Sequence, residues 1–81
     1  MTPELFQRVV LTKDLPTEGL RAGDVGVVVE RYAGRGDVQA GYEPEFFAAT
    51  GETLAVVSVP ATDVRAATDH EVLSVRELTP I

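Results

Sequence analysis

The sequence predicts an all-β domain, and two observations carry this prediction. The 81-residue chain contains 13 valines and 8 threonines, whose branched side chains suit a pleated strand better than a helix. Its apolar runs are short and are separated by glycine and proline, which is typical of a small sheet with tight connections. At this length we expect one domain over residues 1–81, with a thin core.

Two valine-rich runs are expected to form the first strands, over residues 8–12 and 24–32. Residues 13–23 between them hold Pro16 and two glycines and are expected to form one long loop. The second run is apolar on both faces, which predicts a central strand that is covered on both sides. Gly26 within it indicates a bulge, a bend or the close approach of another part of the chain.

The third strand is expected within residues 38–49, after a turn at residues 33–37. Side chains in a strand alternate between two faces, so Phe46 and Phe47 should point in opposite directions. Pro44 cannot donate a hydrogen bond to a neighbouring strand. It therefore predicts that this strand lies at a sheet edge or is interrupted there.

The rest of the chain is expected to add short strands and one helical turn. A tight turn at residues 50–52 precedes a strand over residues 53–59. Residues 61–63 are short enough for a single 3₁₀ turn before a short strand at residues 64–67. Residues 71–78 fit a strand or a two-turn helix, and their β-branched content favours the strand.

Five short strands with this loop spacing predict a small SH3-like barrel, to which the C-terminal run adds an extra strand, because closing a sheet removes exposed edges. The stretch Leu15-Pro16, Gly19-Leu20 and Ala22-Gly23-Asp24-Val25-Gly26 resembles a family of short bacterial domains of unknown function. The resemblance extends over residues 8–76 and implies an SH3-like fold and a bacterial source, but no activity. That family has an aliphatic residue where this chain has Pro44, so residues 38–47 are also expected to include an irregular excursion.

Composition excludes several classes of protein. Seven Lys and Arg residues against 13 Asp and Glu residues give a net charge of −6, which should repel nucleic acids and anionic membranes. The absence of cysteine excludes disulfides, thiolate zinc sites and a cysteine nucleophile. No apolar run is long enough to span a bilayer, and no signal peptide is recognisable, so we expect a cytoplasmic location.

The sequence predicts no enzyme, cofactor or metal site. His70 is flanked by Asp69 and Glu71, but neighbouring residues of a strand point to opposite faces and do not converge on one ion. Ser58 and Ser74 lie in predicted strands rather than in the sharp turn that exposes a nucleophilic serine.

A non-catalytic protein-interaction module is therefore the predicted function, because loops on a rigid scaffold carry binding. The residues expected to contact the partner are Leu15, Pro16 and Leu20 in the long loop, Arg35 in the 33–37 turn, and Phe47. An unpaired edge strand would also allow a homodimer.

Two alternative functions stay open at this point. A small acidic domain is suited to mask a basic protein, as an antitoxin or immunity protein does with a basic toxin. Residues 22–28 also resemble the glycine-containing turn of KOW-type domains, which would place the chain at the ribosome or the transcription machinery.

Overall fold

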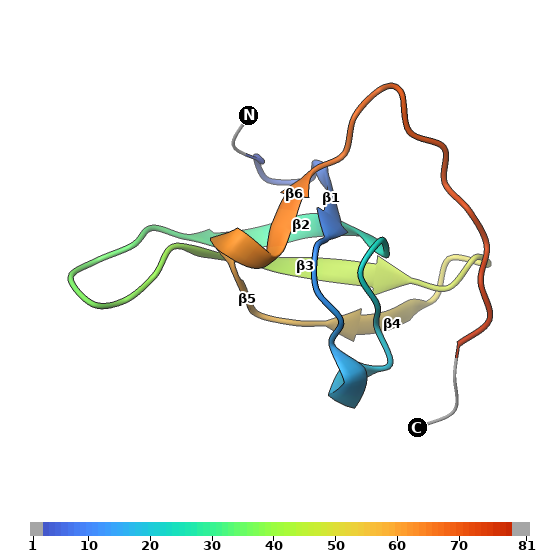
Figure 1. The fold of residues 1–81 in the computed structure, drawn as a ribbon, viewed down its shortest axis with the longest axis horizontal. Coiled ribbons are helices and arrows are strands. Elements are labelled where there is room, and N and C mark those ends of the chain that lie inside the picture. The colour runs from blue at the N-terminus through green and yellow to red at the C-terminus, as the bar shows by residue number, and fades with distance from the viewer. Residues whose placement is uncertain (1–2, 79–81) are drawn as a thin grey trace.

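A computed structural model describes residues 3–78 as one antiparallel sheet with two short 3₁₀ turns, η1 and η2 (Figure 1). The strand order is β4-β3-β2-β1-β6, and β5 pairs with β3. This arrangement confirms the all-β prediction. The elements are β1 (Arg8–Leu11), η1 (Pro16–Glu18), β2 (Val25–Tyr32), β3 (Gly41–Phe47), β4 (Thr53–Val56), β5 (Val59–Pro60), η2 (Ala61–Asp63) and β6 (Val64–Ala66).

The hydrophobic core lies on one face of the sheet and follows the alternation of the strands. In β1, Val9 and Leu11 are fully buried in it, while Val10 between them points to the other face. In β3, Phe46 is buried and its neighbour Phe47 is 43% exposed, which confirms that the two rings point in opposite directions. The buried members of the core are Val9, Leu11, Leu20, Val28, Tyr42, Phe46, Val57, Val59 and Val64.

Gly26 in β2 marks a close approach, one of the three possibilities that the sequence left open. A Cβ atom at this position would lie 3.0 Å from two carbons of the Phe46 ring and 3.1 Å from the Glu45 carbonyl oxygen. The missing side chain therefore makes room for the largest fully buried residue of the core.

Pro44 lies in the interior of the sheet, so the prediction of an edge position is wrong, and β3 is a continuous strand rather than an excursion. The strand itself is not interrupted at Pro44, but its pairing with the neighbouring strands is irregular there. On one side the register with β2 shifts between Val28 and Glu30. On the other side β3 pairs first with β5 and then with β4, and Pro44 lies between these two pairings. Its nitrogen thus falls where the ladder is broken, while its carbonyl accepts a hydrogen bond from the Val57 N–H at 3.2 Å.

The predicted connections are also present. The turn at residues 50–52 is closed by a hydrogen bond from the Ala48 N–H to the Glu52 carbonyl, and Gly51 adopts a φ of 102°, which favours glycine. The predicted 3₁₀ turn is η2. The long loop after β1 is ordered by its own hydrogen bonds, since Leu15 and Leu20 pair across it.

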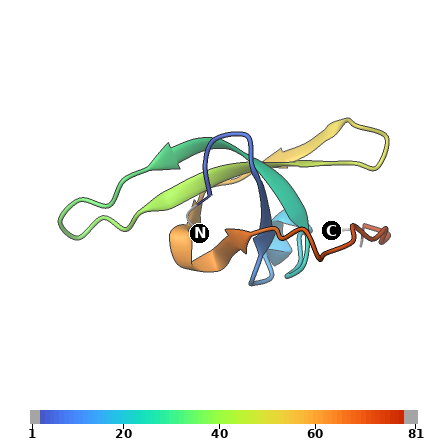
Figure 2. The ribbon, with the colours of Figure 1, turned by 90° about the horizontal axis from the view of Figure 1, so that it is seen from above.

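The prediction of a strand at residues 71–78 is wrong. Residues 67–78, here called the tail, form neither strand nor helix; they swing away from β6 and return along one side of the sheet (Figures 1 and 2). A bend at its start, with Glu71 N–H donating to the Thr68 carbonyl, directs the tail away from the edge of β6, where a further strand would have to pair. No helix within residues 3–78 has the length and apolar character to cross a membrane.

Candidate functional site

The outer face of the sheet, opposite the core, carries an apolar strip whose position follows from strand register. Directly paired residues of antiparallel strands carry their side chains on the same face. Val10 pairs with Val25 on one side and with Arg65 on the other, and Arg8 pairs with Val27 in the next row. The strip therefore consists of three valines with an arginine beside each end.

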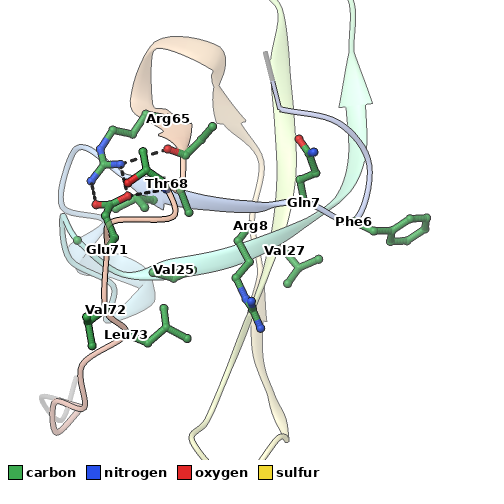
Figure 3. A pocket seen from close by; sticks show the side chains of 14 residues that line it. Phe6, Gln7, Arg8, Val25, Val27, Arg65, Thr68, Glu71, Val72 and Leu73 are labelled. Atoms are coloured by element: carbon green, nitrogen blue, oxygen red, sulfur yellow. Dashed lines mark hydrogen bonds and ion pairs between the residues drawn. The ribbon is translucent and has the colours of Figure 1, made fainter. Parts of the chain in front are cut away.

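An open groove of about 680 Å³ lies over this strip. Val10 is buried, and Val25 and Val27 are half-buried at its floor. Figure 3 shows the tail with Leu73 at one end of the groove and Phe6 at the other, its ring pointing outward. The tail thus covers only part of the apolar strip.

Glu71 attaches the start of the tail to the rim of the groove. Its carboxylate accepts two hydrogen bonds from the Arg65 guanidinium, at 2.8 and 2.5 Å, and a third from the Thr68 N–H at 2.8 Å (Figure 3). The Arg65 guanidinium and the Thr68 N–H together lower the pKa of Glu71 from its usual 4.5 to about 2. Glu71 is therefore ionised at neutral pH and pairs with a fully charged arginine.

A second ion pair attaches the far end of the tail. The guanidinium of Arg76 donates two hydrogen bonds to the Asp24 carboxylate, and a third to the Gly19 carbonyl oxygen at 3.1 Å. Burial raises the pKa of Asp24, but the hydrogen bonds from Arg76 and from the Arg21 N–H outweigh burial, so that the pKa lies below its usual value. This contact ties the tail to the end of the long loop, where β2 begins.

Arg8 is the second cation that lines the groove. Its side chain is exposed, and within residues 3–78 it takes part in no hydrogen bond or ion pair. It projects over the outer face beside Val25 and Val27 (Figure 3). A half-buried apolar strip beside a charged group can recognise a partner in two ways. Covering the strip removes apolar surface from water, which stabilises the complex, and the cation selects a partner with a carboxylate.

Phe6 adds an exposed aromatic ring at the end of the groove. Its side chain is 74% exposed, and its φ of 67° lies in the left-handed region, which is uncommon for any residue except glycine. A hydrogen bond of 2.6 Å from the Phe6 N–H to the Val28 carbonyl oxygen holds this conformation. The strained backbone turns a large apolar side chain outward rather than into the core.

The five residues that the sequence predicted for binding are not brought together. Leu20 is buried in the core and Leu15 packs against it, whereas Pro16 is exposed at the start of η1. Arg35 is exposed in the loop between β2 and β3, and Phe47 is the last residue of β3. Figure 1 shows that this loop, η1 and the end of β3 lie in three separate places.

The histidine singled out in the sequence lies on the surface. The side chain of His70 is 94% exposed, and its Nε2 lies 3.9 Å from the Asp69 carboxylate. Within the described range 3–78, no three His, Asp or Glu side chains are grouped so that they could hold a metal ion.

The sequence did not predict that Val25, Val27 and Arg8 form a groove, although it contains one indication of it. The second run is apolar on both faces, which predicted a cover on the outer side of Val25 and Val27. Nothing in the sequence indicated that the cover would be partial, or that Arg8 would lie beside the uncovered part.

A family model described as Domain of unknown function (DUF4926) matches residues 5–66, more than three quarters of the chain. The chain belongs to the DUF4926 family. No curated protein and no solved structure matches it. The DUF4926 match ends at Ala66, the last residue of β6, so the sheet and the strip lie inside the family pattern and the tail lies outside it.

Proposed function

We propose that this DUF4926 chain is a non-catalytic protein-interaction module and that it binds its partner in the groove. The single observation that carries this proposal is the half-buried valine strip beside Arg8, a cation without a partner in residues 3–78. A partly covered apolar strip gains free energy when a partner covers it, at about 25 cal/mol for each Å² of apolar surface removed from water. The arginine gives such a contact direction and selectivity.

The charge of the groove differs from that of the whole chain. The chain carries a net charge of −6, yet the two charged residues that flank the strip in the sheet, Arg8 and Arg65, are both cations. An acidic segment with apolar side chains is therefore a better match for the groove than a basic one. This local charge favours the interaction module over the masking of a basic toxin.

The ionisable groups around the groove support a binding role rather than proton transfer. Glu71 is held by Arg65, with a pKa of about 2, and Asp24 is held by Arg76. A general acid or base works best with a pKa near the operating pH, and the pKa of Glu71 lies far from it. These groups serve as attachments for the tail.

Two variants with the same change of charge test the proposed function. Arg8→Glu alters the groove, and Arg35→Glu makes the same change at the exposed loop between β2 and β3. Each tagged protein is used to capture proteins from a lysate of the source organism, which are quantified by mass spectrometry. We expect Arg8→Glu to lose at least nine tenths of the partner that the unaltered chain captures, and Arg35→Glu to keep it. Retention by Arg8→Glu, or loss by Arg35→Glu alone, would contradict the proposal.

A homodimer is a second form of interaction that one observation favours. β4 is an edge strand of the sheet, and its sequence Thr-Leu-Ala-Val carries none of the charges or prolines that protect edges. Leu54 and Val56 are 42% and 49% exposed on it, close to the 43% exposed Phe47 of β3. The mass in solution tests this form. We expect a dimer that Phe47→Ser weakens, and a monomeric unaltered chain would contradict it.

A further inference from the structure

The tail indicates which chemistry the groove accepts, because Glu71 and Leu73 line the groove. Glu71 pairs with Arg65 at the rim, and Leu73, two residues later, lines the groove together with Val25. A segment with an acidic residue and, two residues later, an aliphatic residue therefore matches the groove: the acidic side chain pairs with the arginine, and the aliphatic side chain contacts the apolar strip (Figure 3).

The tail is held by its charges and buries little apolar surface. Val72, Leu73 and Val75 are 91%, 62% and 87% exposed. Its attachments are the ion pairs of Glu71 and Arg76, supported by hydrogen bonds. Exposed ion pairs contribute little stability and weaken in salt, so the start of the tail, which the exposed Arg65–Glu71 pair holds, detaches at small cost.

We propose that residues 71–73 occupy the groove as an internal mimic of the partner, and that the partner presents an extended segment with a carboxylate two residues before an aliphatic side chain. This inference rests on the proposed function and names both the class of partner and its competitor. The partner segment replaces Glu71 on Arg65, covers the strip more completely than Leu73 does, and adds a contact to Arg8, which the tail leaves without a partner.

The boundary of the family match supports this division of roles. The strip and Arg65 lie inside residues 5–66, whereas Glu71 and Leu73 lie outside. The receiving surface thus lies within the part of the chain that the family model matches, and the competitor lies beyond that part. Because the tail is joined to the same chain, its effective concentration at the groove is on the order of millimolar or higher, and it competes with a free segment despite its weak contacts.

A pair of matched double variants of the full chain tests the proposal. Glu71→Gln with Leu73→Ser replaces both of these groove-lining side chains and is here called the release variant. Asp69→Asn with Val75→Ser makes equivalent changes at exposed tail positions that do not line the groove, and serves as the control. The probe is a synthetic peptide of residues 67–78 with blocked ends, added in an NMR titration, which detects weak binding.

We expect the peptide to bind the release variant at least tenfold more tightly than it binds either the unaltered chain or the control. Adding Arg65→Glu to the release variant should abolish this binding. Equal affinity for all three proteins, or no binding to the release variant, would overturn the proposal. A dimeric unaltered chain that becomes monomeric only in the release variant would also overturn it, because the tail would then occupy the groove of a second copy.

Partner capture separates this inference from the proposed function. If the groove binds a partner and the tail competes, the release variant captures severalfold more partner than the control, and Arg8→Glu captures almost none. If Arg8→Glu loses the partner but the release variant captures no more than the control, the internal mimic is wrong and the proposed function stands. If Arg8→Glu still captures the partner, the proposed function fails first.

Discussion

Arg76 and Asp24 are separated by 52 residues in the sequence, yet the guanidinium of one donates two hydrogen bonds to the carboxylate of the other. Both side chains are largely covered, with 27% and 17% of their surface exposed. Together with the hydrogen bond from Arg76 to the Gly19 carbonyl, this pair fixes the far end of a segment that has no strand or helix of its own.

The Arg76–Asp24 pair predicts the behaviour of Arg76→Gln. We expect the tail to become mobile, with backbone order parameters below about 0.6 for residues 72–78, because only the Glu71 attachment remains. The free energy of unfolding should change little, since the sheet keeps its contacts. The measurements are ¹⁵N relaxation and urea denaturation, with Arg35→Gln as the control. An unchanged tail would contradict this account of the attachment.

The attachment of the tail should depend on pH with a defined sign. The pKa values of both Glu71 and Asp24 are lowered in the folded chain, so their ion pairs are fully formed above their usual values of 4.5 and 3.8. The Glu71 pair should be lost as the pH falls towards about 2. NMR signals of residues 69–75 between pH 6 and pH 2 measure this change, and Glu71→Gln should remove the Glu71 contribution. Tail signals that stay constant to pH 2, or that change in the same way in Glu71→Gln, would refute this assignment.

Gly26→Ala should destabilise the fold. The added methyl group would meet the ring of Phe46, which is buried, and the backbone oxygen of Glu45. Overpacking of this kind costs about 1–3 kcal/mol, which exceeds the gain that replacing a glycine by alanine otherwise brings. Urea denaturation measures the effect, with Val38→Ala at an exposed position as the control. A stability equal to that of the unaltered chain would show that β2 and β3 adjust freely.

The two adjacent phenylalanines should differ sharply when each is replaced by alanine. Phe46→Ala leaves a cavity in the core and should cost about 3–5 kcal/mol. Phe47→Ala changes a side chain that is 43% exposed and should cost about 1 kcal/mol or less. Thermal unfolding of both variants provides the comparison, and similar losses would contradict the assignment of the two faces of β3.

Much of the fold could be predicted from local pattern. Alternation placed Phe46 and Phe47 on opposite faces, and residues 61–63 formed the expected turn. Gly26 indicated a bulge, a bend or a close approach, and the structure has the close approach. The place of Pro44 in the sheet was harder to predict, because a proline, which has no N–H, fits either an edge strand or a break in strand pairing. The break arises only when the β2 register shift and the gap between β4 and β5 meet at one residue, and these are features of the assembled sheet.

The candidate site depended on contacts that no local pattern contains. The β-branched content of residues 71–78 favours a strand, but Glu71 and Arg76 pair with side chains, and Asp24 is far away in sequence. Arg8 and Val27 become neighbours only through the register of β1 and β2. The long loop had been expected to carry binding, but Leu20 is buried within it and so stabilises the loop.

The most direct test of the central claim is where a ligand perturbs the sheet. A ¹⁵N–¹H spectrum of the release variant is recorded with and without the peptide of residues 67–78. We predict that the largest shifts fall on the amides of Val10, Val25 and Val27 and of Arg8 and Arg65, which form and flank the groove. Shifts that gather instead on residues 33–40 or at the end of β3, or the absence of any shift, would show that the groove is not the binding surface.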